Sequence, residues 1–149
     1  MTDIGLMHYF LGLEIWQDPR HIFLGKGKYE VDILRRFRIE DCRPMSTPMI
    51  TNGKKLHASK GELVGPTLYR QLIGSLMYLV NSRLDLCFVV NTLSQFMVEP
   101  RRVHWIATKH VLRYFASTLD CGLDYRRSDG VSLIGFTDSD RAGIVADRK

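Results

Sequence analysis

Residues 101–118 read RRVHWIATKHVLRYFAST, and their spacing predicts a helix that packs against neighbours on more than one side. Apolar side chains recur along one face at Val103, Ala107, Val111, Tyr114 and Phe115. The opposite face carries Arg102, Lys109 and Arg113, and a second apolar line joins Trp105 to Leu112. A helix with two apolar lines and one basic edge is expected to lie between other elements.

Two further helices are predicted directly before this one. The first runs from about Tyr69 to Ser82 with Pro66-Thr67 as its entry, and the second from near Asp85, a candidate N-cap, to the break at Pro100. Their inward side chains are expected to be Leu68, Leu72, Leu76, Leu79 and Val80, then Leu86, Val89, Val90, Leu93, Phe96 and Met97.

The N-terminal part predicts a β-hairpin followed by a short helix. In LMHYFLGLEIWQDPRHIFLGKGKY, residues 6–29, one apolar run from Phe10 to Ile15 is broken at Asp18-Pro19 and a second starts at Ile22. In KYEVDILRRFRIEDC, residues 28–42, apolar side chains share one helical face, and Pro44 and Pro48 stop the helix. The polar, glycine-containing stretch that follows, to about Gly65, predicts an exposed linker.

Strand-like patterns return after Gly122. LDYRR is followed by a turn at Ser128–Gly130 and then by VSLIGFTDSD. Asp138 and Asp140 would share one side of a strand, as in half of a metal site, although the bare spacing is more typical of a polar strand end. The whole pattern predicts an α+β fold: a hairpin and short helix, a linker, three helices, and C-terminal strands.

Composition excludes several classes of protein. The chain has 149 residues, 45% of them hydrophobic, which is enough for a packed core. It contains neither a signal-peptide pattern nor a long apolar run, so we expect an intracellular protein, cytoplasmic or nuclear, without membrane contact. Its three cysteines are widely spaced, which favours reduced thiols over a disulfide framework or zinc site. The net charge of +5 mildly favours a polyanionic partner.

Six motifs, in order, resemble the Pol polyproteins of copia-type retrotransposons. They cover nearly the whole chain and read LMHYFLGLEI, IFLGKGKYEVDILRRF, DCRPMSTPM, LYRQLIGSLMYLVNSRLDL, HWIATKHVLRYFASTLDCGLDY and LIGFTDSDRAG. The resemblance implies a parent protein with RNA-directed DNA polymerase and ribonuclease H activities. It also implies four segments: 1–48 as a primer-grip-like hairpin and helix, 49–65 as a linker, 66–121 as a helical thumb and connection, and 122–149 as the start of a truncated ribonuclease H-like domain.

The resemblance also indicates what this chain lacks. The family's polymerase aspartates lie in a Tyr-x-Asp-Asp motif, and no such motif occurs in these 149 residues. Phe136-Thr137-Asp138 matches the strand whose aspartate binds catalytic Mg²⁺, so Asp138, with Asp140 beside it, is the candidate metal-binding and catalytic position. Two carboxylates are too few for such ions. We therefore expect no tight Mg²⁺ binding and no enzymatic activity from this chain alone.

The expected partners are an RNA–DNA or DNA duplex and the missing palm, fingers and ribonuclease H portions of the polyprotein. Basic side chains on solvent faces would contact phosphates without reading bases. The candidate binding residues are Phe10, Leu11 and Gly12, which match the family's Phe-Leu-Gly, together with Lys26, Lys28, Arg35, Arg102, Lys109 and Arg113. Taken singly, each basic residue is more typical of a solvated helix face.

Other functions remain open at this stage. The chain could be a non-catalytic nucleic-acid-binding module, or an interaction protein that uses apolar faces left by the missing palm. Two departures from the family pattern suggest a decayed or fragmentary copy. Arg83-Leu84-Asp85 replaces Arg-Pro-Asp, and Arg141 stands where an aromatic residue usually follows the second aspartate.

Overall fold

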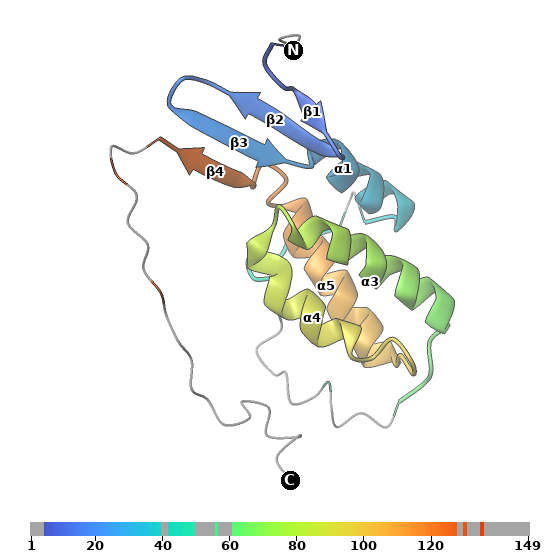
Figure 1. Cartoon of the computed structure of the whole chain (residues 1–149). Helices are drawn as coiled ribbons and strands as arrows, with labels where there is room; N and C mark the ends of the chain where they lie inside the picture. The colour runs from blue at the N-terminus through green and yellow to red at the C-terminus, as the bar shows by residue number, and fades with distance from the viewer. Residues whose placement is uncertain are drawn as a thin grey trace.

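The computed structural model describes residues 5–39, 42–49, 56, 61–127, 130 and 135. A four-stranded sheet sits at one end of a layer of helices (Figure 1). In chain order the elements are β1 (Tyr9–Phe10), β2 (Leu13–Gln17), β3 (His21–Gly25), α1 (Gly27–Arg36), α3 (Pro66–Val80), the 3-10 helix η1 (Leu84–Leu86), α4 (Cys87–Ser94), α5 (Arg102–Ala116) and β4 (Leu123–Arg126). The predicted α+β class is confirmed.

The sheet is antiparallel throughout, in the order β1-β2-β3-β4. The predicted hairpin is β2 and β3, with Ile15 opposite Leu24. Its turn forms because the Asp18 carboxylate accepts hydrogen bonds from the backbone N–H groups of Arg20 (2.6 Å) and His21 (3.1 Å). The apolar run before it is not one strand, because a turn at Leu11-Gly12 separates β1 from β2.

The strand predicted at LDYRR after Gly122 is confirmed as β4 (Leu123–Arg126). It pairs with β3, with Phe23 opposite Asp124, a partner that the sequence did not indicate. Gly122 permits this approach, since a Cβ there would collide with the Leu24 carbonyl and the Phe23 ring. The later predicted strand, residues 131–140, lies outside the described residues apart from Gly135.

Helix α1 buries the predicted apolar face but ends earlier than the sequence suggested. Ile33 and Leu34 are buried, as expected. The helix stops at Arg36 because Arg38 adopts a left-handed conformation with φ of 54°. The N–H of Arg38 bonds the Arg35 carbonyl and the N–H of Ile39 bonds the Leu34 carbonyl, at 3.1 and 3.0 Å. This is a Schellman C-cap, so the end of the helix is local and does not require Pro44.

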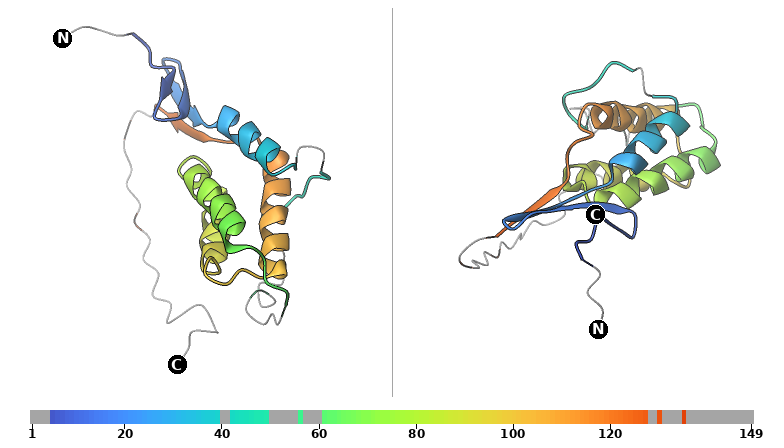
Figure 2. Two further views of the ribbon diagram at one scale, coloured as in Figure 1. Left: turned by 90° about the vertical axis from the view of Figure 1, so that its right-hand side faces the viewer. Right: turned by 90° about the horizontal axis from the view of Figure 1, so that it is seen from above.

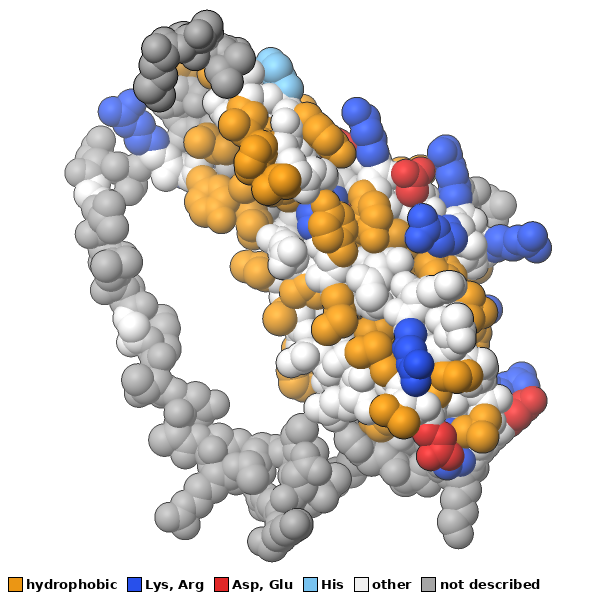
Figure 3. Space-filling view, turned by 45° about the vertical axis from the view of Figure 1, so that its right-hand side comes forward, with side chains coloured by type: hydrophobic (Ala, Val, Ile, Leu, Met, Phe, Trp, Pro, Cys, Tyr) orange, Lys and Arg blue, Asp and Glu red, His pale blue; other side chains and the backbone are white. Residues whose placement is uncertain are grey.

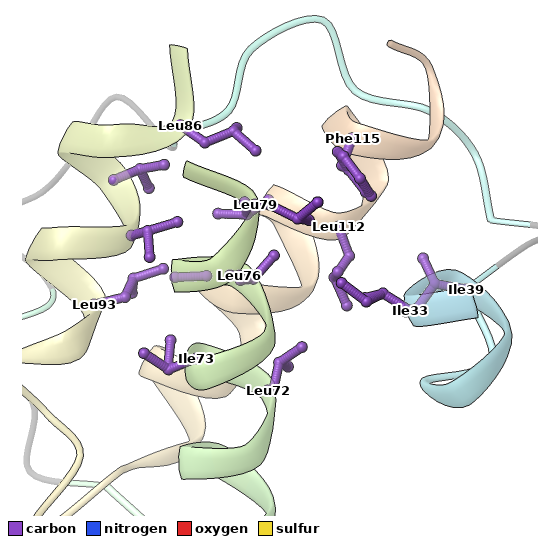
Figure 4. Packing of buried hydrophobic residues seen from close by; sticks show 14 of the residues in the cluster. Ile33, Ile39, Leu72, Ile73, Leu76, Leu79, Leu86, Leu93, Leu112 and Phe115 are labelled. Carbon is purple, nitrogen blue, oxygen red and sulfur yellow. The ribbon is translucent and has the colours of Figure 1, made fainter. Parts of the chain in front are cut away.

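The helical layer contains the core. Helix α4 packs against both α3 and α5, and α1 contributes from the sheet side, as two further views show (Figure 2). Ile33 of α1 points toward Leu112 of α5 in the close-up of the core (Figure 4). Leu56, from the predicted linker, is also buried in this cluster. Most of the residues predicted to face inward from the three helices are at least partly buried. The prediction for Leu68 is wrong, because 46% of its surface is exposed.

The starts of α3 and α5 are tied together by backbone pairing. Leu63 and Arg101 form an isolated antiparallel bridge, with Val64 N–H bonded to the Pro100 carbonyl at 2.8 Å. His104 then caps α5, because its Nδ1 accepts the Arg101 N–H at 3.0 Å while its Nε2 bonds the Leu56 carbonyl at 2.9 Å. His104 therefore has a structural role at this helix start.

Candidate nucleic-acid interface

The three residues predicted to grip nucleic acid, Phe10, Leu11 and Gly12, form an exposed turn at the edge of the sheet. Phe10 is 51% exposed and Leu11 is 76% exposed. Both turn residues have positive φ, 49° at Leu11 and 80° at Gly12, as a tight two-residue hairpin of the primed type requires. The turn therefore presents a large apolar side chain outward from a constrained backbone.

Next to this turn, helix α1 carries a shallow groove that brings two of the predicted basic residues together. Lys28 and Arg35 both line it, separated by Val31 and Asp32 on the same side of the helix. Glu14 of β2 closes the sheet end of the groove and accepts the Lys28 backbone N–H at 3.0 Å. The groove has a volume of about 400 Å³. The groove therefore brings together two cations, Lys28 and Arg35, and two carboxylates, Glu14 and Asp32.

The expectation that Lys26 lies on a solvent face is wrong. Lys26 is 2% exposed, and its ammonium donates a hydrogen bond to the Tyr78 carbonyl while lying 3.5 Å from the centroid of the Tyr78 ring. Burial lowers the pKa of Lys26, and nearby Glu30 partly opposes that shift. The sequence could not show this, because Lys26 lies two residues from the exposed Lys28 and has the same charge.

The basic edge of α5 is present but is partly occupied within the protein. Arg102 forms a surface ion pair with Glu62 at 3.3 Å. Arg113 donates from Nε to the Arg43 carbonyl at 2.7 Å. Lys109 lies 5.5 Å from the centroid of the Trp105 ring and is exposed. Of the three, Arg102 is paired with a carboxylate and Arg113 is held by a backbone carbonyl, while Lys109 is exposed.

The partner of Arg113 belongs to a segment, residues 43–47, that runs along α5. His110 bonds the Thr47 carbonyl at 2.8 Å, and Ser117 donates to the Met45 carbonyl at 3.1 Å. Together with Arg113 these side chains hold residues 43–47 against the helix. Helical periodicity marks these side chains as outward-facing but does not reveal that a distant segment covers them. Figure 3 shows Lys and Arg side chains gathered along one side of the molecule and hydrophobic side chains over much of the same face.

Behind the candidate interface lies a buried charge cluster that sequence reasoning missed. Arg83, 1% exposed, makes a two-pronged contact to the Asp85 carboxylate, with distances of 3.0 Å from Nε and 2.8 Å from NH2. It also donates to the backbone carbonyl and the hydroxyl of Thr118, both at 2.7 Å. Tyr114 adds a 3.0 Å bond to Asp85. Asp85 is therefore a partner for Arg83 and not the predicted N-cap of a helix.

Glu30 is the exceptional member of this cluster. It is fully buried at 0% exposure, and neither carboxylate oxygen has a hydrogen-bond partner among the described residues. The nearest cation is Arg83, with 3.8 Å between NH1 and Oε1. Burial raises the pKa of Glu30 to about 7, while the charge of Arg83 works in the opposite direction. The available sequence signal was the close spacing of Arg83 and Asp85; nothing marked Glu30.

The amino-acid sequence of the chain is similar to several known proteins. The chain is 41% identical over 141 residues, 95% of its length, to the retrovirus-related Pol polyprotein from transposon RE2 of Arabidopsis thaliana. It is 34% identical over 158 aligned residues to the corresponding polyprotein from transposon TNT 1-94 of Nicotiana tabacum. Over nearly its whole length the chain is similar to a segment of the Pol polyproteins of copia-type retrotransposons. This confirms the resemblance drawn from the six motifs.

The match covers a small part of each Pol relative. The chain spans about a tenth of their length, 10% of the RE2 polyprotein and 12% of the TNT 1-94 polyprotein. An uncharacterized mitochondrial protein of Arabidopsis thaliana is 36% identical over 151 aligned residues, and 62% of that protein is covered. No family model matches the chain, and no solved structure matches it.

The predicted metal-binding residues are Asp138 and Asp140. Asp138 and Asp140 lie outside the described residues. Within the described part of the chain, no group of three or more His, Cys, Asp or Glu side chains could hold a metal ion. Over the same residues, no helix combines the length and apolar character needed to cross a bilayer.

Proposed function

We propose that this chain is the part of a copia-type Pol polyprotein that holds the RNA–DNA duplex during reverse transcription. In this proposal residues 66–121 correspond to the thumb and connection, and residues 122–149 to the start of the ribonuclease H portion. The parent polyprotein would carry out RNA-directed DNA synthesis and cleavage of hybrid RNA. The chain itself would supply binding and not chemistry.

The observation that carries the proposal is the α1 groove beside the exposed turn. Lys28 and Arg35 share one groove, and exposed Phe10 and Leu11 lie at the adjacent sheet edge. Tyr9, 62% exposed, lies near the Lys28 ammonium, 6.0 Å from ring centroid to Nζ. Cations that contact phosphates supply most sequence-independent affinity, and exposed aromatic rings can stack against sugars or bases. A duplex backbone following α1 would meet both kinds of contact.

The inference of no catalysis rests on ligand number. Two-metal chemistry on nucleic acids needs several oxygen ligands for each Mg²⁺ ion. The sequence provides no Tyr-x-Asp-Asp motif, and Asp138 with Asp140 would supply two carboxylates. Mg²⁺ therefore belongs to the parent enzyme in this proposal. The chain's own residues contribute cations that neutralise phosphate charge and apolar groups that position the duplex.

The proposal is tested by measuring binding of a fluorescent RNA–DNA hybrid to the full chain between about 50 and 200 mM salt. Each phosphate contact contributes roughly 0.9 to the slope of log Kd against log salt, so we expect a slope of about 3 or more. The same samples, incubated with Mg²⁺, should contain intact hybrid. Salt-independent or absent binding would contradict the proposal, as would hybrid cleavage that disappears in an Asp138→Asn variant.

A further inference from the structure

Tyr78 stands where three segments of the chain meet. It lies on α3, is 37% exposed, and donates a hydrogen bond from its hydroxyl to the Leu11 carbonyl at 3.0 Å. The Tyr29 ring of α1 meets its ring edge to face, with centroids 4.8 Å apart. The buried Lys26 ammonium lies against the same ring and bonds the Tyr78 carbonyl. Lys26 and Tyr29 therefore fix the ring, and the hydroxyl at its tip reaches the turn.

Few backbone hydrogen bonds hold the turn that Tyr78 contacts. Strand β1 has two residues, with Tyr9 opposite Glu14 and Phe10 opposite Leu13, and one further backbone bond from the Ile15 N–H to the His8 carbonyl (2.9 Å) extends this pairing. Leu11 has a φ of 49°, which costs a residue with a side chain about 1–2 kcal/mol. A short edge strand with a strained turn opens readily unless another contact holds it. The Tyr78 hydroxyl provides a contact from the helical layer.

Gly12 is shaped to allow this contact. A Cβ added at Gly12 would overlap the Tyr78 hydroxyl, and its φ of 80° is also unfavourable for any residue with a side chain. Glycine at this position therefore serves both the turn and the close approach of the tyrosine. In this chain the glycine of the Phe-Leu-Gly motif therefore has a structural role: Gly12 leaves space for Tyr78, which holds the turn.

We propose that Tyr78 is a positioning residue that fixes the Phe10–Gly12 turn relative to α1, so that the turn and Lys28 act on nucleic acid as one rigid surface. The inference rests on the proposed function for its effect on binding. The position of the turn can be measured without nucleic acid. Tyr78 contributes through the backbone of Leu11, and its own side chain need not touch the duplex.

The test uses Tyr78→Phe in the full chain, because this change keeps the ring between Lys26 and Tyr29 and removes the bond to Leu11. We expect amide hydrogen exchange to rise several-fold in a peptide covering the turn. Exchange in α3 and α5 should stay unchanged, because the turn can open locally while the core remains folded. The Kd for the hybrid should rise about 3- to 10-fold. The salt slope should stay the same because no charge is removed. Tyr125→Phe, an exposed tyrosine on β4, is the matched control and should change neither quantity.

Each outcome is decisive. Unchanged exchange at the turn in Tyr78→Phe would overturn the inference, and so would faster exchange with an unchanged Kd. Loss of protection throughout α3 and α5 would show a general structural role and would also overturn it. If the wild-type chain does not bind the hybrid, the proposed function fails, while the exchange data still decide whether Tyr78 holds the turn.

Discussion

Glu30 shows how much one side chain can matter in this protein. Its carboxyl is fully buried and lacks hydrogen-bond partners among the described residues, while the Arg83 guanidinium nearby is already bonded to Asp85 and Thr118. A buried carboxylate without hydrogen bonds is costly. Protonation removes the charge and with it most of that cost. The raised pKa is therefore a consequence of packing and not of a neighbouring anion alone.

This makes the free energy of unfolding depend on pH in a definite direction. The pKa of Glu30 is about 7 in the folded chain, against 4.5 as its ordinary value. A carboxyl group whose pKa is raised by folding stabilises the folded chain fully at pH values below its ordinary pKa. This stabilisation is lost as the pH rises through the pKa of the folded state. Unfolding by urea should therefore require roughly 2 to 3 kcal/mol more at pH 5 than at pH 8. In Glu30→Gln this difference should shrink to that of the other groups.

Asp32→Asn is the control, because Asp32 lies on the same helix with its side chain exposed. This variant should keep the pH dependence of the wild type. An unchanged pH profile in Glu30→Gln would show that Glu30 does not titrate in this range in the folded chain.

The residue scale also shows where sequence reasoning stops. Lys26 and Lys28 have the same charge and lie two positions apart, yet one is buried under Tyr78 and the other is exposed. Nothing local separates them, because the difference arises when α1 packs on α3. Gly12 is the contrasting case. Its place in the Phe-Leu-Gly motif pointed to a special role, although its partner Tyr78 could come only from the structure.

At the scale of elements, Arg83 joins the end of α3 to the segment after α5. It lies three residues past the end of α3, and its guanidinium bonds Thr118, two residues past the end of α5. Asp85, in η1, holds the other side of the guanidinium. One planar side chain thus fixes three elements by directed bonds. In the Arg83-Leu84-Asp85 sequence, which differs from the family's Arg-Pro-Asp, the arginine and the aspartate are retained, and these two residues make the contact. The position that differs from the family, Leu84, is not part of it.

Arg83→Lys should therefore destabilise the fold strongly although the charge is kept. A lysine cannot make the two-pronged contact to Asp85 while also reaching Thr118. Buried acceptors left without donors, and a buried ion pair that is broken, cost about 3 to 5 kcal/mol. We expect a loss of at least about 2 kcal/mol in the free energy of unfolding, measured with urea.

Arg102→Lys is the matched comparison for that variant, because Arg102 pairs with Glu62 on the surface, where such pairs contribute about 0 to 1 kcal/mol. Equal effects of the two changes would show that burial and geometry at Arg83 do not matter.

Elements were predicted well where the information is local. The periodicity of residues 101–118 predicted α5, and the break at Asp18-Pro19 predicted the β2–β3 hairpin. Pairing partners far apart in sequence were not predicted. Strand β4 joins β3 across about a hundred residues, and residues 43–47 lie along α5. Such contacts depend on how the core brings segments together, which neither alternation nor helical spacing encodes.

At the scale of the whole molecule, the sheet edge and α1 form one continuous candidate interface, whereas α5 lies partly under the chain's own segment 43–47. The sequence did not show this difference between the two basic clusters, because both carry Lys and Arg at positions expected to face solvent. The proposed binding surface is the groove with Lys28 and Arg35 together with the turn beside it. The similarity to copia-type Pol polyproteins rests on the comparisons, and duplex binding is the proposal that the experiments test.

The most direct test reverses two charges in the groove and two elsewhere. Lys28→Glu with Arg35→Glu should weaken hybrid binding at least about 10-fold and lower the salt slope by about 2, because each removed phosphate contact lowers it by roughly 1. Arg20→Glu with Arg127→Glu changes the net charge equally at exposed sites around the β2–β3 turn and should cost less than about 3-fold. Equal weakening by both pairs, or none by the groove pair, would contradict a duplex site on α1.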